Sequence, residues 1–128
     1  MKYFGTDGFR GEANKNLNVY HAFKIGRFIG DYFSTKNNGH GKILIGKDTR
    51  RSSYMFEDAL SAGITSSGSN AHLLHVTPTP SVSYITRTED FDCGIMITAS
   101  HNPYHDNGIK IINKNGEKME CIPNCKAY

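Results

Sequence analysis

Short apolar runs alternate along this chain with segments whose apolar residues recur at helical spacing. Three of the runs predict buried strands, at Lys42–Gly46, Ala71–Val76 and Cys93–Thr98. Apolar residues three or four apart predict amphipathic helices over Asn18–Phe33 and Met55–Ile64. Alternation of strands with helices is typical of a sheet with parallel strand pairs and helices on both faces.

The rest of the chain completes this pattern. A third helix is predicted from Thr79 to about Thr86, with Thr79 as N-cap and Pro80 as the first helical residue. A fourth strand, Ile109–Asn113, follows the strand at Cys93–Thr98 after a loop too short for a helical crossover, so antiparallel pairing is expected. The predicted fold is therefore α/β, a three-layer α/β/α domain with a mixed, mostly parallel four-stranded sheet.

The size and charge of the chain narrow its function. Its 128 residues fit one domain, and a net charge of +3 is mild. The longest basic run is Arg50-Arg51, whereas nucleic-acid-binding domains cluster their cations, so no nucleic-acid partner is expected. A small excess of cations suits a phosphorylated metabolite, but it suits an ordinary solvated surface equally well.

The chain carries no signal for export or membrane insertion. No apolar run approaches the ~20 residues of a membrane span, and the first residues lack the apolar region of a signal peptide. The three cysteines, Cys93, Cys121 and Cys125, form no paired framework and are too few for a structural zinc site. These observations predict a cytoplasmic protein without a membrane partner.

The segment Thr98–Pro103 contains several side chains that could take part in catalysis or binding. Ser100 comes just after a predicted buried strand, and ligands of such sheets bind beyond the carboxyl ends of the parallel strands. An exposed serine at that edge is a candidate carrier of a phosphoryl group. The alternative is that Ser100 and Asn102 only organise a turn, as serine and asparagine often do.

Cations surround Ser100 in the predicted fold. His101, His105 and Lys110 follow it closely in the chain, and Arg10 is expected to reach it from the N-terminal segment. A phosphoserine carries a charge of about −1.5 to −2 near neutral pH and accepts several charge-assisted hydrogen bonds. These residues therefore suit a phosphate on Ser100.

Other mechanisms lack their usual motifs. No Gly-x-Ser-x-Gly surrounds Ser100, and the chain has no P-loop and no Gly-x-Gly-x-x-Gly, which disfavours hydrolase, nucleoside triphosphate and dinucleotide chemistry. His72 and His75 alternate with leucines in a predicted strand. This pattern indicates packing or edge positions rather than metal ligands.

Four motifs, taken together and in order, resemble the α-D-phosphohexomutase family. They are Tyr3–Gly11, Ile45–Arg50, Thr77–Pro80 and the Thr98–Pro103 segment followed by Asn107–Lys110. The resemblance spans about Tyr3 to Lys118, and the opening motif is most similar to that of the phosphoglucosamine mutase branch. It implies the N-terminal domain I of such an enzyme.

The resemblance also implies roles for individual residues. Ser100 would be the phosphorylated serine, which exchanges its phosphoryl group with a sugar 6- or 1-phosphate through a 1,6-bisphosphate intermediate. His101 and Lys110 would transfer protons and contact phosphate, and Arg10 would contact the phosphoserine. Asp48 and Arg50 are expected to be mainly structural, bracing the end of a strand and the start of the next helix.

For the parent enzyme, the resemblance implies interconversion of glucosamine 6-phosphate and glucosamine 1-phosphate. A phosphoglucomutase or phosphomannomutase is the first alternative, since some of these open with a similar motif. A non-catalytic binding or assembly module is the second, because part of the expected active site is missing from the sequence. The substrate is accordingly expected to be a hexosamine or hexose phosphate.

The family's magnesium site is incomplete in this chain. The resemblance implies Mg²⁺ bound by the phosphate of Ser100 and by aspartates of a second domain, which this sequence lacks; Asp90 and Asp92 form only an isolated pair. Residues 1–128 are therefore expected to be domain I, with 119–128 an irregular or truncated tail. Without the metal-binding, sugar-binding and C-terminal phosphate-binding domains, the isolated chain is expected to be inactive.

Overall fold

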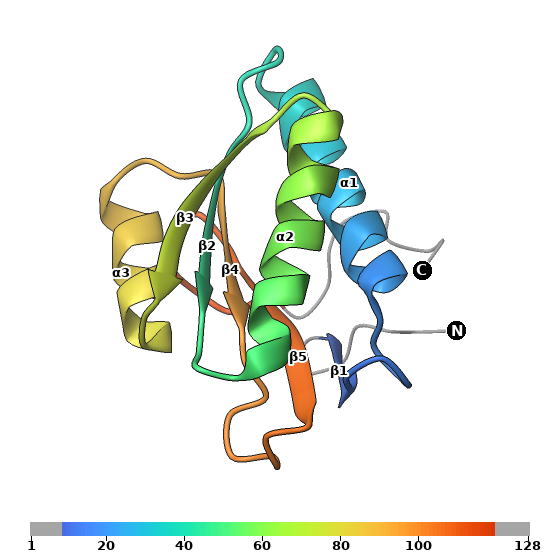
Figure 1. Ribbon diagram of the computed structural model, residues 1–128. Helices are drawn as coiled ribbons and strands as arrows, with labels where there is room; N and C mark the ends of the chain where they lie inside the picture. Colours follow the sequence, from blue (N-terminus) through green and yellow to red (C-terminus); the bar gives the residue numbers. More distant parts are fainter. Residues whose placement is uncertain (1–8, 120–128) are drawn as a thin grey trace.

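Five strands form one mixed sheet in the part of the chain that the computed structural model describes, residues 9–119 (Figure 1). The strands are β1 (Phe9–Glu12), β2 (Lys42–Lys47), β3 (Asn70–Val76), β4 (Cys93–Ile97) and β5 (Asp106–Ile112). Their order is β1-β5-β4-β2-β3. β2 pairs in parallel with β3 and β4, whereas β5 runs antiparallel to β4 and β1. The predicted mixed α/β sheet and the antiparallel last strand are confirmed.

The sheet has one strand more than the predicted four. β1 contains four residues, one of them a glycine, so it is too short to show a periodic pattern. It forms by pairing Phe9 with Ile109 and Glu12 with Asp106. The same pairing starts β5 at Asp106, three residues before the predicted start at Ile109. The pairing of β1 with β5 therefore determines both that β1 forms and where β5 begins. Phe9 of β1 is also buried in the core.

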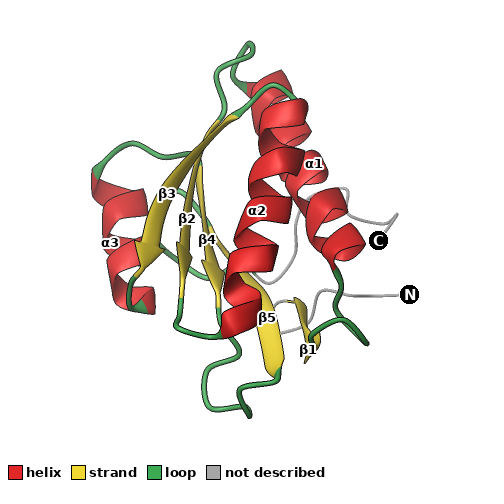
Figure 2. Ribbon diagram, viewed as in Figure 1, coloured by secondary structure: helices red, strands yellow, loops and turns green. Residues whose placement is uncertain are grey.

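Three helices cover the two faces of the sheet (Figure 2). α1 (Val19–Lys36) and α2 (Arg51–Ser66) lie on one face, and α3 (Thr79–Thr88) lies on the other. Asn18 caps α1 as predicted, since its Oδ1 accepts a hydrogen bond of 3.0 Å from the His21 N–H. In α3 the cap is Pro78 and Thr79 is already helical. Pro80 fits the first turn because its missing N–H has no intrahelical acceptor there.

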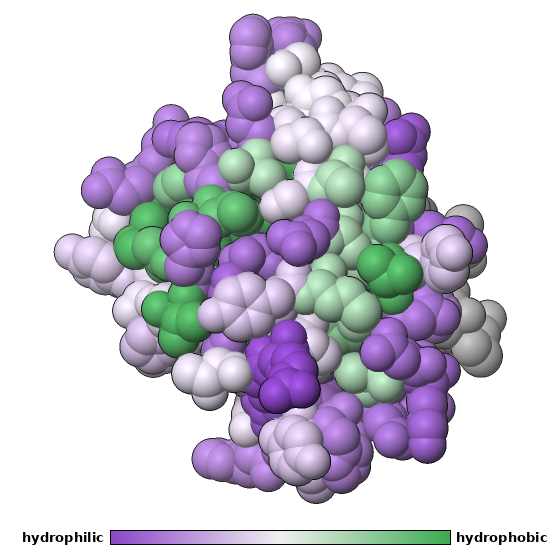
Figure 3. Space-filling view, in the orientation of Figure 1, coloured by the Kyte–Doolittle hydropathy of each residue, from purple (hydrophilic) through white to green (hydrophobic). Residues whose placement is uncertain are grey.

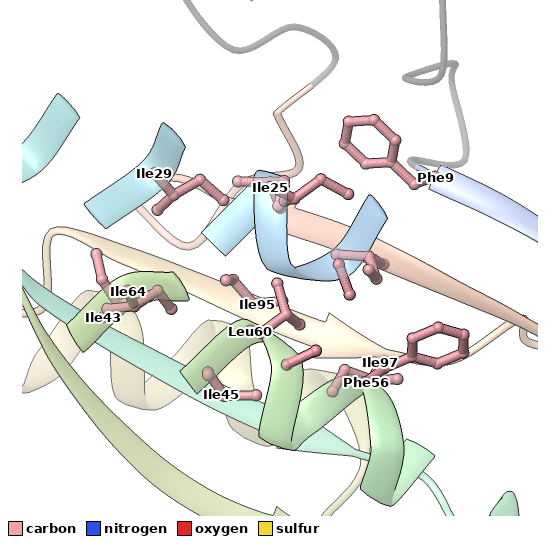
Figure 4. Packing of buried hydrophobic residues seen from close by; sticks show 14 of the residues in the cluster. Phe9, Ile25, Ile29, Ile43, Ile45, Phe56, Leu60, Ile64, Ile95 and Ile97 are labelled. Atoms are coloured by element: carbon pink, nitrogen blue, oxygen red, sulfur yellow. The ribbon is translucent and has the colours of Figure 1, made fainter. Parts of the chain in front are cut away.

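The larger core lies between the sheet and the α1–α2 layer (Figure 4). Labelled side chains that meet there are Ile25 and Ile29 of α1, Phe56, Leu60 and Ile64 of α2, and Ile43, Ile45, Ile95 and Ile97 of the sheet. Gly26 lets the two helices approach closely, because a Cβ at this position would lie 2.5 Å from the carbonyl oxygen of Leu60. Backbone contact at Gly26 thus sets the spacing of the helix layer.

A smaller core lies under α3. It joins Val82 of α3 and Phe91 to Leu44, Met96 and Ile112 of the sheet. Successive residues of a strand point to opposite faces, so the apolar run of β2 serves both cores. This explains why β2 and β4 read as continuous apolar runs rather than alternating ones.

β3 is an edge strand, and its two histidines were predicted to take packing or edge positions. His72 contacts the ring of Phe91 edge-on, and His75 has a positive φ of 65° beside a register shift in the β2–β3 pairing. Figure 3 shows hydrophobic side chains over α3 and β3, whereas the lower end, which carries the loops after β2 and β4, is mainly hydrophilic.

None of the helices within residues 9–119 has the length and apolar character needed to cross a membrane. The motif residues 3–8, Cys121, Cys125 and the tail from 120 onward lie outside the described residues. Cys93 is buried, and burial raises the pKa of its thiol. That thiol is therefore a packing group and not a nucleophile.

Candidate functional site

Ser100 is exposed in the loop after β4, and each of its polar groups is hydrogen-bonded. Its N–H donates to Thr98 Oγ1 at 3.0 Å, and its carbonyl accepts from Arg50 Nη2 at 3.1 Å. Its Oγ accepts from Lys110 Nζ at 2.7 Å. Partners from three parts of the fold thus fix a serine whose φ of 54° is left-handed. This conformation is uncommon for a residue other than glycine and often marks a functional site.

The antiparallel pairing of β4 with β5 places Lys110 beside Ser100. Met96 is paired with Lys110, and Ile97 with Ile109, so the chain returns along the strand that leads into the Ser100 loop. Lys110 is half-buried, and its ammonium lies within hydrogen-bond distance of the hydroxyl. A phosphate on Oγ would therefore meet a cation that is already in place, and such charge-assisted contacts are the strong ones.

Arg10 supports the same loop from β1. It is paired with Gly108, and its Nη1 donates to Asn102 Oδ1 at 3.4 Å. Asn102 in turn donates to Asp106 Oδ2 at 3.2 Å. A Cβ at Gly108 would lie 2.7 Å from the carbonyl oxygen of Thr98, so only glycine allows this close approach of β5 to the loop. The hydrogen bond of Arg10 reaches Asn102, two residues beyond Ser100.

The two histidines predicted to surround Ser100 lie at the exposed side of the loop. His101 follows Ser100 in a turn and is exposed. His105 Nε2 lies 3.7 Å from Asp106 Oδ1. Of the four predicted site residues, the geometry therefore brings Lys110 directly to the Ser100 hydroxyl and leaves His101 open to solvent.

Sequence reasoning missed the contact of Arg50 with the Ser100 loop. Besides Ser100, its Nη2 donates to the Asn102 carbonyl at 2.7 Å, and its Nη1 donates to Thr98 Oγ1 at 3.3 Å. The available signal was its place at the carboxyl end of a parallel strand, where the loops of neighbouring strands meet.

Asp48 holds Arg50 and the start of α2. Its carboxylate pairs with Arg50 Nη1 and accepts hydrogen bonds from the Arg50 N–H at 3.0 Å and from Ser53 Oγ at 2.8 Å. Burial raises the pKa of Asp48, but hydrogen bonds from Thr98, the Arg50 backbone and Ser53, together with the Arg50 charge, outweigh it. The net result is a pKa below the usual aspartate value, and the carboxylate is charged at neutral pH.

The described residues do not assemble a metal site. Within residues 9–119 no group of three or more His, Cys, Asp or Glu side chains could hold a metal ion. Asp92 Oδ2 accepts from the Lys42 N–H at 2.8 Å, and Asp90 lies 3.8 Å from Lys114 Nζ. Both aspartates precede β4, at the opposite end of this strand from Ser100.

Comparisons with known proteins show which proteins this chain is similar to. The family model of the phosphoglucomutase/phosphomannomutase α/β/α domain I matches residues 1–121. Phosphoglucosamine mutases of Lachnospira eligens and Lachnoclostridium phytofermentans are 72% and 67% identical, each over 93% of this chain. The match covers 27% and 26% of those proteins, so the chain spans about a quarter of their length.

A solved structure gives the same result for the fold. A phosphoglucomutase/phosphomannomutase family protein from Burkholderia thailandensis superposes with a TM-score of 0.74 at 26% identity. The superposition covers 88% of this chain and 26% of that protein. The three-layer fold is thus similar to one part of a longer protein.

Proposed function

This chain belongs to the phosphoglucomutase/phosphomannomutase family as its α/β/α domain I, and we propose that the whole protein interconverts glucosamine 6-phosphate and glucosamine 1-phosphate. The observation that carries the proposal is the exposed Ser100 hydroxyl, held in a left-handed turn 2.7 Å from the Lys110 ammonium. The glucosamine assignment is supported by the names of the relatives at 72% and 67% identity.

In the proposed reaction Ser100 carries the phosphoryl group. The P–Oγ bond breaks as a new P–O bond forms to a hydroxyl of the sugar phosphate, which gives a 1,6-bisphosphate; transfer of the other phosphoryl group back to Oγ releases the isomer. Lys110 donates a proton to Oγ as the serine leaves, and a base near the sugar accepts the hydroxyl proton. Phosphoryl transfer depends chiefly on positioning and charge neutralisation, which the loop supports.

The remaining site residues have supporting roles in this proposal. Arg10 contacts the phosphoserine, and His101 contacts phosphate or transfers a proton. For Arg10 the support is its hydrogen bond to Asn102 in the same loop. For His101 it is exposure next to Ser100, where a side chain is free to turn toward a bound substrate.

Magnesium enters the proposal only through a phosphate on Ser100. Residues 9–119 do not supply the oxygen ligands that Mg²⁺ needs, so the other ligands would come from outside the described part of the chain. When bound, the ion would neutralise phosphate charge. The parent is accordingly proposed to be a cytoplasmic phosphoprotein whose metal-binding, sugar-binding and C-terminal phosphate-binding domains complete the site.

We propose further that residues 1–128 act as domain I, with 119–128 as its tail, and that the chain by itself is inactive. Incubation of the isolated chain with Mg²⁺ and a hexose 1,6-bisphosphate tests this. Sugar-phosphate turnover by the chain alone would contradict it, and would also exclude the reading of the chain as a non-catalytic binding module.

The substrate test is an assay of the full-length protein with several hexose phosphates. We expect a strong preference for glucosamine phosphates. A preference for glucose or mannose phosphates would instead favour a phosphoglucomutase or phosphomannomutase. That alternative is supported by the likeness to the Burkholderia thailandensis family protein.

A further inference from the structure

We infer that Arg50 is a positioning residue for phosphoryl transfer at Ser100, an inference that rests on the function proposed above. The guanidinium donates hydrogen bonds to the loop before, at and after the serine, namely to Thr98 Oγ1, the Ser100 carbonyl and the Asn102 carbonyl. It touches no atom that reacts. Its effect on the reaction is therefore exerted through the conformation of Ser100.

The conformation of Ser100 needs such support. A φ of 54° is unfavourable for serine and persists only when the surroundings hold it. The Thr98 hydroxyl oxygen accepts a hydrogen bond from the Ser100 N–H. The same oxygen accepts a second hydrogen bond from Arg50 Nη1. Arg50 thus stabilises the backbone on both sides of the Ser100 Cα, and this backbone directs the Ser100 side chain toward Lys110.

The contacts suit an arginine and no other side chain. A planar guanidinium presents several donors in a fixed fork, whereas a lysine ammonium is one point charge on a flexible stem. The Arg50 side chain is 10% exposed, and its Nη1, which donates to Thr98, also pairs with the Asp48 carboxylate. Removal of the guanidinium would leave three acceptors in the loop and the Asp48 carboxylate without their shared donor.

The expected consequence is a fall in kcat with little change in KM. Substrate contacts remain when Arg50 is replaced, but the serine oxygen is no longer held in line for transfer. A misplacement of about 1 Å by a residue away from the chemistry can cost roughly 10²-fold in rate. A residue with a purely structural role would instead lower the amount of folded enzyme and leave both constants unchanged for the molecules that fold.

The test uses the full-length protein with Arg50→Gln and Arg50→Lys, and with Arg51→Gln as the matched control, because Arg51 is an exposed arginine next in the chain. Steady-state kinetics give kcat and KM, and hydrogen exchange with mass spectrometry follows the peptide that contains the Ser100 and Asn102 amides. We expect kcat to fall about 10²-fold in Arg50→Gln and about tenfold in Arg50→Lys. Exchange in this peptide should accelerate at least about tenfold in Arg50→Gln, because the local opening becomes easier. Arg51→Gln should match the wild type in both measurements.

Two results would overturn the inference. One is a kcat for Arg50→Gln within about threefold of that for Arg51→Gln; the other is a full wild-type kcat in Arg50→Lys, which also decides the case if Arg50→Gln fails to fold. If the full-length protein turns over no hexose phosphate, the proposed function fails separately. Exchange then decides alone: faster exchange in Arg50→Gln supports the positioning role, and unchanged exchange contradicts it.

Discussion

Two ion pairs start at adjacent residues where β2 ends, yet they serve different parts of the molecule. Lys47 pairs with Glu57 at 2.8 Å inside the protein, where the two side chains are 2% and 5% exposed. Asp48 pairs with Arg50 in a more open position, at 21% and 10% exposure, and this pair continues into the Ser100 loop. The first pair fastens α2 to the sheet, and the second fastens a loop to α2.

Their surroundings explain the difference. Lys47 Nζ also lies 3.9 Å from the centre of the Tyr54 ring, so Lys47 contacts two side chains of α2, Tyr54 and Glu57. Oε2 of Glu57 is buried without a hydrogen bond. His75 Nδ1 lies 4.0 Å from this oxygen, which is too far for a hydrogen bond. A buried pair whose partners need each other makes stability sensitive to substitution. The outer pair distributes its hydrogen bonds over the loop, so its loss should affect activity first.

Replacing the serine gives the largest expected effect, on the loop side of this comparison. Ser100→Ala in the full-length protein should abolish mutase activity, because alanine has no oxygen to carry the phosphoryl group. The fold should be retained, since substitutions at exposed loop positions usually change stability by under about 0.5 kcal/mol. Turnover, phosphosite mass spectrometry and a thermal melt measure this, with Ser83→Ala as control. The mechanism would be contradicted by near-normal turnover of Ser100→Ala. It would also be contradicted if phosphate were found on Ser81 or Ser83 and never on Ser100. Loss of activity through unfolding would mean that Ser100 only organises the turn.

Lys110→Ala should have the next largest effect. The variant keeps Ser100 and so still accepts a phosphoryl group, but it lacks the cation and proton donor 2.7 Å from Oγ. Turnover should fall by about 10²–10⁴-fold. Kinetics together with the phosphoserine content measure this, and Lys114→Ala, an exposed lysine in the turn after β5, is the control. Equal turnover in the two variants would show that Lys110 takes no part.

Substitution in the inner pair, Lys47 and Glu57, should change stability rather than activity. Lys47→Met leaves the Glu57 carboxylate buried without its partner, and we expect a loss of about 3–5 kcal/mol in the free energy of unfolding. The double variant Lys47→Met with Glu57→Leu should recover most of this loss, since no unpaired charge remains. Urea unfolding of the chain measures both. If the single variant is as stable as the double one, the two side chains do not depend on each other.

A smaller loss is expected where the helices touch. Gly26→Ala would place a methyl group 2.5 Å from the Leu60 carbonyl oxygen, so α1 and α2 must separate. Overpacking of this kind costs about 1–3 kcal/mol. Lys24→Ala, which puts the same residue on the exposed side of α1, is the control in urea unfolding. In the full-length protein, kcat per folded molecule should stay unchanged for Gly26→Ala, which separates the helix layer from the loop.

Acid should produce the smallest effect, on the outer pair. The pKa of Asp48 is lowered in the folded chain, so the folded state binds this proton less tightly than the unfolded state does. The stability contributed by Asp48 is therefore present above the usual aspartate pKa and is lost as the pH falls through the folded value. The free energy of unfolding of the wild type, measured from neutral pH into this acid range, should decrease more steeply than that of Asp48→Asn. Parallel curves would show that Asp48 does not contribute.

The architecture could be predicted from the sequence more fully than the contacts within the site. The buried strands β2 and β4 were predictable because long apolar runs record burial on both faces. β1 was not, because its ladder with β5 depends on residues far away in the chain. The position of Ser100 beyond the carboxyl end of β4 was predictable from the order of the strands along the chain. The position of Lys110 near Ser100 follows from the antiparallel pairing of β5 with β4.

The role of Arg50 lay beyond sequence reasoning for a physical reason. Its contact with the Ser100 carbonyl joins residues 50 positions apart, through a side chain whose direction is set by Asp48. Periodicity and motif spacing describe the backbone path but not the aim of a long flexible side chain. Similar limits apply to Arg10, which proved to donate a hydrogen bond to Asn102.

The antiparallel return from β4 to β5 also makes this loop suitable for engineering. Lys110 lies within β5, and Ser100 is held close to the end of β4 by hydrogen bonds with Thr98 and Arg50, so their separation is set at the base of the loop. The tip, Pro103–His105, is exposed, and the Tyr104 side chain is 83% exposed. Side chains at the tip can therefore be exchanged while Ser100 and Lys110 keep their spacing. A library confined to Pro103–His105 would vary the approach to the serine without rebuilding the domain.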